Sequence, residues 1–173
     1  MFTTADRFAQ GLTFDQFVEK YPVNGRTFRT NYEDIEVDPE TVEYFRALAG
    51  RHGGKLDVVV VAADWCPDAQ ENVPIIAKLA SVCPFMEVRL FDRDADADIM
   101  DQLLSDGRRT IPAVAILDSG YQEIGRWIER PRAAHDFLRE GMKEVRQALR
   151  ARYHSGDFRQ ETLRELVHAT EER

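Results

Sequence analysis

The apolar positions of the chain predict four β-strands. Residues 55–63, Lys-Leu-Asp-Val-Val-Val-Val-Ala-Ala, are a nearly continuous β-branched run, which predicts a strand covered on both faces. Shorter apolar runs predict strands at 85–92, 111–117 and 121–127. Because only the turn 118–120 separates the last two, we expect them to form an antiparallel hairpin.

Apolar residues at helical spacing predict helices between and around these strands. Asp38 followed by Pro39 predicts a helix start, because aspartate caps a helix and proline suits its first position. Thr13 with Gln16 predicts a capping box that restarts the first helix. The predicted helices are 5–20, 38–49, 67–82, 96–105, 131–153 and 158–171. Residues 21–37, which contain proline and an Asn-Gly pair, predict a loop.

The order of these elements predicts an α/β fold in three layers. In the middle of the chain the order is β-α-β-α-β-β-α. Strand–helix–strand units place neighbouring strands parallel, and the final hairpin adds an antiparallel pair. We therefore expect one mixed parallel and antiparallel sheet with helices on both faces, and extra helices at both ends of the chain.

Composition and charge narrow the function classes. The chain has 173 residues, enough for one domain with a full hydrophobic core. Its net charge of −8 argues against a nucleic-acid partner and against an anionic membrane surface. No apolar run approaches the roughly 18 residues of a membrane span, and the start shows no signal-peptide pattern. Two cysteines do not make a disulfide framework, so we expect a cytoplasmic protein.

Neither the histidines nor the aspartate-rich loop predicts a metal site. The four histidines share no ligand-like spacing. Alternate aspartates at 92–98 suggest a calcium loop, but an EF-hand beginning at Asp92 needs glycine and glutamate where the chain has Ala97 and Leu103. We expect these aspartates to cap the next helix, and we expect no metal.

The segment Asp64-Trp65-Cys66-Pro67-Asp68 is the strongest candidate for chemistry. It follows the buried strand and begins the helix 67–82, which places Cys66 at a helix N-terminus. Unpaired backbone N–H groups there stabilise a thiolate and can lower a thiol pKa from about 8.5. The negative charges of Asp64 and Asp68 oppose this effect. These residues alone leave open a reactive thiol or a small residue at a helix cap.

The sequence Ala-Ala-Asp-Trp-Cys-Pro-Asp-Ala at 62–69 resembles the active-site segment of thioredoxins, in which Trp-Cys-X-X-Cys follows the central strand. Pro74 lies where thioredoxins carry the proline that kinks the active-site helix. Thr110-Ile111-Pro112 resembles the thioredoxin loop that contains a cis-proline. These matches imply a thioredoxin-like fold, although such domains carry many functions.

The resemblance covers roughly residues 39–150 and implies a thioredoxin-like domain at 39–153, whose closing helix is 131–152. Residues 1–38 are then an N-terminal helical extension packed on the core, and residues 154–173 a C-terminal helix, in one compact domain. By the same resemblance the catalytic residue is Cys66, and the substrate-binding residues are Trp65, Pro67, Ile111, Pro112 and Gly125. Asp68 is a second catalytic candidate because it lies in the first turn of the predicted helix, near the thiol.

Two departures from thioredoxins bear on the activity. Ala69 stands where thioredoxins have the second cysteine, so an external thiol would have to resolve a mixed disulfide. Cys83 is no substitute, because seventeen helical residues place it about 25 Å away and a disulfide needs under about 7 Å. Val60 stands where thioredoxins have a buried acidic residue. Asp68 is the candidate to replace it, and the alternative is a carboxylate that only stabilises the helix start.

The sequence leaves two functions open. The first is a monothiol thiol–disulfide oxidoreductase, in which Cys66 attacks a disulfide and a low-molecular-weight thiol such as glutathione resolves the mixed disulfide. Its partners are then a protein disulfide or that thiol. The second is a redox-inactive module that binds an extended peptide in the groove between Trp65 and Ile111-Pro112. For either function we expect a monomer or weak homodimer without a resident cofactor.

Overall fold

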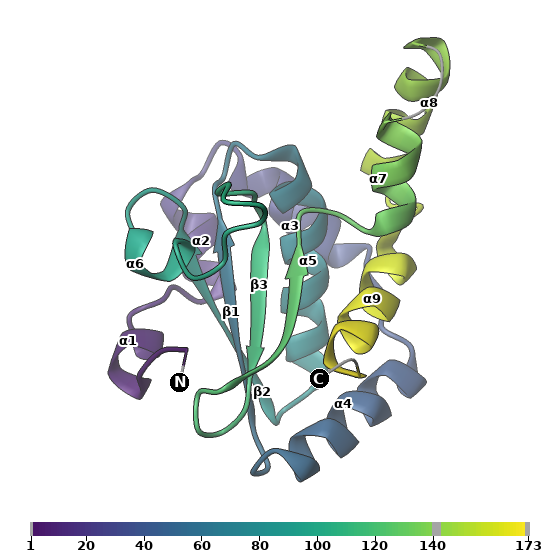
Figure 1. The fold of residues 1–173 in the computed structure, drawn as a ribbon. Helices are drawn as coiled ribbons and strands as arrows, with labels where there is room; N and C mark the ends of the chain where they lie inside the picture. The colour runs from purple at the N-terminus through teal and green to yellow at the C-terminus, as the bar shows by residue number, and fades with distance from the viewer. Residues whose placement is uncertain (1, 140–142, 172–173) are drawn as a thin grey trace.

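A four-stranded sheet lies at the centre of the computed structural model, which describes residues 2–139 and 143–171 (Figure 1). The strands are β1 (Leu56–Ala62), β2 (Met86–Asp92), β3 (Ala113–Leu117) and β4 (Glu123–Ile128). Their order across the sheet is β2-β1-β3-β4. β1 runs parallel to β2 and antiparallel to β3, and β3 and β4 form the predicted antiparallel hairpin. The predicted mixed sheet is therefore confirmed.

β1 is a central strand because its side chains are apolar on both faces. All seven of its residues are buried, as the β-branched run predicts. Asp57 is its charged member, and the carboxylate lies 2.8 Å from the Lys55 ammonium. Burial raises the pKa of Asp57, and Lys55 opposes that rise. The ion pair therefore offsets part of the cost of burying the carboxylate inside the sheet.

Helices surround the sheet, and several of them lie before the first strand or after the last one. Before β1 they are α1 (Ala5–Ala9), α2 (Phe14–Lys20), α3 (Gly25–Glu33) and α4 (Pro39–Arg51). After β1 they are α5 (Pro67–Val82), α6 (Ala97–Met100), α7 (Arg132–Arg139), α8 (Lys143–His154) and α9 (Arg159–Glu171). The helix starts predicted at Thr13 and Asp38 are confirmed by side-chain caps. Within the described ranges, no helix has the length and apolar character to cross a membrane.

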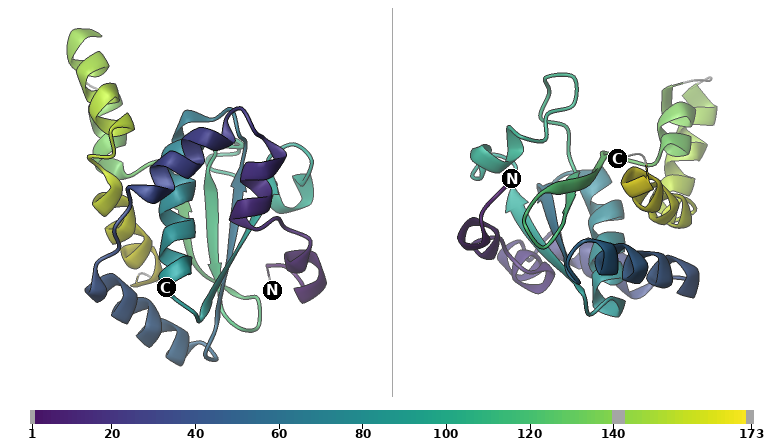
Figure 2. Two further views of the ribbon diagram at one scale, coloured as in Figure 1. Left: turned by 180° about the vertical axis from the view of Figure 1, so that it is seen from behind. Right: turned by 60° about the horizontal axis from the view of Figure 1, so that its bottom comes forward.

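One face of the sheet is covered by α5 and α9, with α3 packed against α5 (Figures 1 and 2). Trp127 of β4 points to this face, because its indole Nε1–H donates to Glu165 of α9 over 2.9 Å. Gly125 lies two residues earlier on the same face. A Cβ added to Gly125 would lie only 2.6 Å from Thr170 of α9, so the missing side chain is what lets α9 approach β4 closely.

The opposite face is covered by the N-terminal segment. The Arg7 guanidinium lies 5.0 Å from the ring centroid of Phe91, and Phe8 is 2% exposed. Leu12 forms an antiparallel bridge with Leu90, at the outer edge of β2. The sheet therefore lies between two layers, which confirms the three-layer α/β/α architecture.

The aspartate-rich loop after β2 is held by hydrogen bonds different from those expected. Asp92 accepts the backbone N–H groups of Asp94 and Ala95, each over 2.9 Å. Asp96 is the N-cap residue of α6, but its side chain makes no capping bond there and instead accepts from the Asp92 N–H and from Arg7. The expectation that these aspartates cap the next helix is therefore wrong in detail, because the N-terminal segment supplies a competing cation.

The prediction of a loop over residues 21–37 is wrong, because α3 lies within it. Only three residues of α3 are buried, among them Phe28 and Asn31, so the segment has few apolar positions from which a helix could be predicted. Tertiary contacts hold the helix instead: Phe28 is fully buried, and the Asn31 amide donates to the Gln70 carbonyl of α5 over 2.9 Å.

The prediction of a single helix over residues 131–153 is also wrong. α7 and α8 are two helices that lie side by side and project away from the sheet (Figures 1 and 2). The helix that closes the fold against β4 and α5 is α9. Apolar periodicity could not show this, because each helix keeps a spacing of about 3.6 residues whichever way the chain then turns.

Candidate functional site

Cys66 lies where the chain turns from β1 into α5. It is the N-cap residue, with an extended backbone (φ −80°, ψ 119°), and Pro67 opens the helix. The Cys66 N–H donates to the Ala63 carbonyl over 3.1 Å, and the Cys66 carbonyl accepts from the Gln70 N–H over 3.0 Å. The turn is thus fixed from both sides, and the predicted position of Cys66 at a helix N-terminus is confirmed.

The fold brings Cys66 beside Ile111 and Pro112. The Cys66 thiol donates to the Ile111 carbonyl at a distance of 3.6 Å between Sγ and O. The Ile111–Pro112 peptide bond is cis. Cys66 is 6% exposed and Ile111 is 7% exposed, so both lie at the floor of the site and not on its rim.

Burial raises the pKa of the Cys66 thiol above its ordinary value, and the negative charge of Asp68 adds to the rise. The backbone N–H groups of Ala69 and Asp68 and the Arg130 guanidinium act in the opposite direction, but they do not outweigh burial. A lowered thiol pKa at this helix N-terminus is therefore not found. At neutral pH Cys66 carries its proton, and that proton is what it donates to Ile111.

Trp65 forms an exposed wall next to the buried thiol. Its exposed fraction is 57%, and the Arg93 guanidinium lies 5.8 Å from the centroid of its ring. Arg93 is itself anchored, because its Nε–H donates to the Arg109 carbonyl over 3.1 Å. Arg93 therefore contacts both Trp65 and the loop that leads to Ile111.

A second exposed apolar residue comes from the N-terminal extension and precedes a residue that contacts Asp64. Val23 is 83% exposed, between α2 and α3. The next residue, Asn24, donates its amide to the Asp64 carboxylate over 2.6 Å. This bond ties the connection between α2 and α3 to the residue before Trp65. Sequence reasoning placed nothing of residues 1–38 at the site.

Asp68 lies in the first turn of α5 and forms an ion pair. Its carboxylate is 2.6 Å from the Arg130 guanidinium, which also binds Glu129. Burial raises the pKa of Asp68, while Arg130 and a hydrogen bond from the Tyr153 hydroxyl oppose the rise. Asp68 is thus neither a free proton acceptor nor a simple helix-start carboxylate.

Asn72 organises the polar groups around this ion pair, and sequence reasoning missed it. It is 1% exposed, and its amide nitrogen donates to the Asp68 carbonyl and to the Tyr153 hydroxyl. Its amide oxygen accepts from the Thr162 hydroxyl over 2.8 Å. Asn72 therefore joins α5 to α8 and α9. An asparagine on an otherwise apolar helical face was the available signal.

A polar cavity of about 300 Å³ opens beside Asp68. Its lining consists of Pro67, Asp68, Arg130, Arg150, Tyr153 and His154. It lies against the first turn of α5, which also carries Cys66. Because Arg130 is paired with Asp68 and Glu129, Arg150 is the lining arginine that can meet a small anionic group. No group of three histidine, cysteine or acidic residues that could hold a metal ion occurs among the described residues.

Of the other predicted positions, Gly125 and Cys83 lie away from the thiol, and Ala69 offers it only a backbone N–H group. Gly125 does not reach the site that we expected it to line, because it packs under α9 as described above. Ala69 is fully buried, which leaves no second thiol in the first turn. Cys83 ends α5 and is fully buried, and burial raises its pKa to about 11. Its position at the other end of α5 from Cys66 agrees with the expectation that Cys83 is no substitute for a second active-site cysteine.

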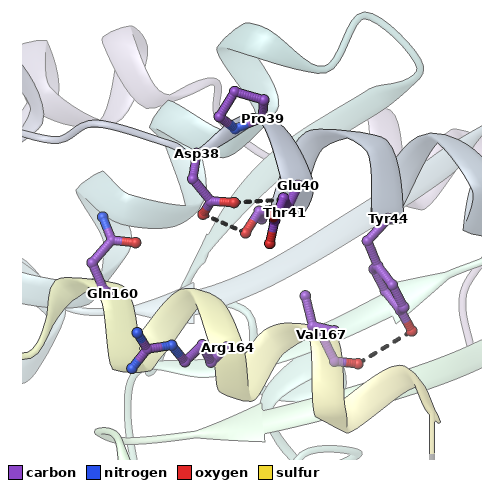
Figure 3. Close-up of a pocket in the computed structure, with 8 residues that line it drawn as sticks. All are labelled: Asp38, Pro39, Glu40, Thr41, Tyr44, Gln160, Arg164 and Val167. Atoms are coloured by element: carbon purple, nitrogen blue, oxygen red, sulfur yellow. Dashed lines mark hydrogen bonds between the residues drawn. The ribbon is translucent and has the colours of Figure 1, made fainter.

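A larger hollow of about 590 Å³ lies far from Cys66, between α4 and α9 (Figure 3). Several of its polar groups form hydrogen bonds within the protein. Asp38 accepts from the Thr41 N–H and hydroxyl, and the Tyr44 hydroxyl donates to the Val167 carbonyl over 3.3 Å. These bonds cap α4 and hold α9 in place, so we assign this hollow a structural role.

The buried N-cap cysteine, the adjacent cis-proline and the mixed sheet are the features of a thioredoxin-like protein. The sequence profile of a family described as Thioredoxin matches residues 11–163, and the chain belongs to that family. The match extends beyond residues 39–150, over which we recognised the resemblance, and takes in most of the N-terminal extension.

Two solved structures share this fold. One is a crystal structure of a protein of unknown function from Pseudomonas aeruginosa, with 24% identity, a TM-score of 0.77 and 99% of each chain covered. The other is a designed scaffold for an HIV epitope, with 22% identity, a TM-score of 0.76 and the same coverage. Among curated proteins none matches. These likenesses extend to the whole chain, helices at both ends included.

Proposed function

We propose that this protein is a thioredoxin-like binding module that holds an extended segment of a partner protein against Trp65 and Ile111-Pro112. The observation that carries the proposal is the state of Cys66, the thiol at the centre of the site. It is 6% exposed, donates its proton to Ile111 and has a raised pKa. Because the thiolate is the nucleophile in disulfide exchange, a thiol held in this state is a poor catalyst.

The surface around Trp65 and Ile111-Pro112 offers what an extended peptide needs. Trp65 presents an exposed aromatic surface that Arg93 holds in place. The backbone N–H of Ile111 has no acceptor among the described residues, so a peptide carbonyl can bind there. Val23 adds apolar surface from the N-terminal extension. A peptide bound in this way needs no reaction at Cys66.

A second function, monothiol exchange, is supported by the surroundings of Asp68. The N–H groups of Asp68 and Ala69 reach the Cys66 sulfur and favour its thiolate. The neighbouring cavity, where Arg150 is exposed, offers a place for the carboxylate of a low-molecular-weight thiol such as glutathione. In that reaction Cys66 attacks a disulfide sulfur and expels one thiolate, and the external thiol then attacks the mixed disulfide and regenerates Cys66.

One experiment separates the two functions. Peptides selected on the wild-type protein from a random heptapeptide library under reducing conditions are measured against three variants. The binding module predicts that Cys66→Ser changes affinity by less than about threefold, whereas Trp65→Ala weakens it at least about tenfold. Val82→Ala is the matched control, because Val82 is also an exposed apolar residue but lies at the far end of α5.

Monothiol exchange makes the opposite prediction. Turnover of bis(2-hydroxyethyl) disulfide by glutathione would then require Cys66 and be lost in Cys66→Ser, while Cys83→Ala would retain it. Such turnover, together with peptide capture that reductant abolishes, would replace the binding module with the oxidoreductase. We further propose that the protein works in the reducing cytoplasm as a monomer or weak homodimer, since both of its cysteines are free.

A further inference from the structure

Asp64, the residue before Trp65, carries a carboxylate that the fold does not neutralise. Its Oδ2 accepts from the Asn24 amide over 2.6 Å. Among the described residues no arginine, lysine or histidine forms an ion pair with it. Its other oxygen, Oδ1, has no hydrogen-bond partner in the same part of the chain and is not one of the buried polar atoms, so it faces solvent.

The cations near Asp64 already have carboxylates of their own. Three arginines beside Trp65 and in the loop that leads to Ile111 form the pairs Arg93–Asp94, Arg108–Asp106 and Arg109–Asp101. Lys20, at the end of α2, helps to hold the pKa of Asp92 below its ordinary value. None of these cations is therefore left over for Asp64.

The opposite side of the site carries no surplus of positive charge either. Asp68 and Glu129 share the Arg130 guanidinium, and the one further arginine of the adjoining cavity, Arg150, balances the second carboxylate. The described charged groups around the site are thus matched apart from Asp64, which leaves an excess of one negative charge beside Trp65.

Trp65 supplies the second half of a site for a cation. Its indole ring is already within reach of one cation, Arg93, whose guanidinium lies 5.8 Å from the ring centroid, and 57% of the side chain is still exposed. An aromatic ring next to a carboxylate fits lysine or arginine, because the ring and the carboxylate both attract the positive charge while the aliphatic stem packs on the ring. Val23, which is 83% exposed and precedes Asn24, adds apolar surface for the same stem.

We propose that Asp64 determines the specificity of the site by selecting a partner segment that carries a lysine or arginine side chain. This inference rests on the proposed binding module and names the chemistry of its partner. An acidic segment is a poor occupant, because its carboxylate would meet the unpaired Asp64 at the same place. The net charge of −8 acts in the same direction, since it attracts a basic segment from a distance.

The first test compares the sequences of bound peptides. Heptapeptides are selected from a random library under reducing conditions on the wild-type protein, on Asp64→Asn and on Asp6→Asn. Asp64→Asn keeps an oxygen for the Asn24 amide and removes only the charge, and Asp6→Asn removes an exposed carboxylate on α1. We expect lysine and arginine to be at least about threefold more frequent at one peptide position for the wild type and Asp6→Asn than for Asp64→Asn.

The second test measures the pair directly with the tightest-binding peptide. Replacing its basic residue by glutamine should weaken binding to the wild type at least about fivefold, and binding to Asp64→Asn less than about twofold. Peptides that need Trp65 but show no basic preference, or equal losses in the two proteins, would overturn the role of Asp64 and leave the binding module standing. Selection of no peptide, or of peptides insensitive to Trp65→Ala, would overturn both.

Discussion

At the scale of single residues, the protonation of Cys66 decides the chemistry of the site. A helix N-terminus lowers a thiol pKa when its N–H groups are the main interaction, but here desolvation is the largest influence. Asp68 adds a negative charge that its ion pair with Arg130 offsets only in part. A helix N-terminus that would lower the pKa of a solvent-exposed cysteine therefore does not lower the pKa of this buried one.

The alkylation rate of Cys66 should report this balance directly. In a Cys83→Ala background, we expect the midpoint of the rate against pH to lie above about 8.5, the value of a free thiol. Asp68→Asn should lower the midpoint, because it removes a charge that disfavours the thiolate, and Asp101→Asn, an exposed carboxylate, should leave it unchanged. A midpoint below about 7 would contradict the binding module and favour thiol exchange.

The raised pKa of Cys66 also has a consequence for stability. The folded state holds the thiol proton more tightly than the unfolded state does, so the stabilisation is present below the ordinary thiol pKa and is lost as pH rises through the folded value. We expect the free energy of unfolding to fall above about pH 8.5, and to fall less steeply in Cys66→Ala. Urea unfolding at several pH values measures both slopes, and equal slopes would contradict the raised pKa.

At the scale of elements, α9 is held against the sheet and α5 by small and polar residues. Gly125 removes a side chain where α9 crosses β4, and Asn72 with Thr162 provides a buried hydrogen bond between α5 and α9. Hydrophobic periodicity does not encode such contacts, because neither residue belongs to an apolar stripe. They nevertheless determine which C-terminal helix closes the fold.

Gly125→Ala should therefore destabilise the protein. The new Cβ would lie 2.6 Å from the Thr170 Cγ2 and 3.0 Å from the Ala169 carbonyl oxygen, and backbone cannot yield as a flexible side chain can. We expect a loss of about 1–3 kcal/mol in urea unfolding. Gly50→Ala is the control: it meets nothing within 4 Å on α4 and should be neutral or stabilising by up to about 1 kcal/mol. Equal effects of the two substitutions would contradict the close packing of α9 on Gly125.

Asn72→Ala should destabilise by about 2–3 kcal/mol, because it removes two buried hydrogen bonds, one with the Thr162 hydroxyl and one with the Tyr153 hydroxyl. Tyr153→Phe should cost less, and the two losses should not add, since both remove the same 2.6 Å bond. Gln102→Ala, which removes a hydrogen bond from a side-chain amide on the surface, is the control. Additive losses would show that Asn72 and Tyr153 act independently.

At the scale of the whole molecule, the N-terminal segment is part of the core. Phe2, Phe8 and Phe17 are buried, and Arg7 reaches across to Asp96 and Asp98 beside α6. Without this segment one face of the sheet would be exposed to water. The family match beginning at residue 11 includes much of this segment.

Phe8→Ala should consequently behave as a core substitution. We expect a loss of about 3–5 kcal/mol in chemical unfolding, as for a buried phenylalanine elsewhere. Val23→Ala, at a site 83% exposed, should change stability by less than about 0.5 kcal/mol. A small effect of Phe8→Ala would mean that the N-terminal segment is an accessory and not a layer of the fold.

The sequence by itself determined the sheet, most helix starts and the position of Cys66, because these depend on local patterns: the valine run, the caps at Thr13 and Asp38, and proline after the strand. Tertiary structure decided the rest. Whether α3 forms depends on Phe28 finding a core, and which helix closes the fold depends on Gly125 admitting α9. The protonation of Cys66 depends on its burial beside Ile111 and on the negative charge of Asp68. The solvation of a side chain depends on all the residues that surround it in the folded protein, so no local sequence pattern predicts it.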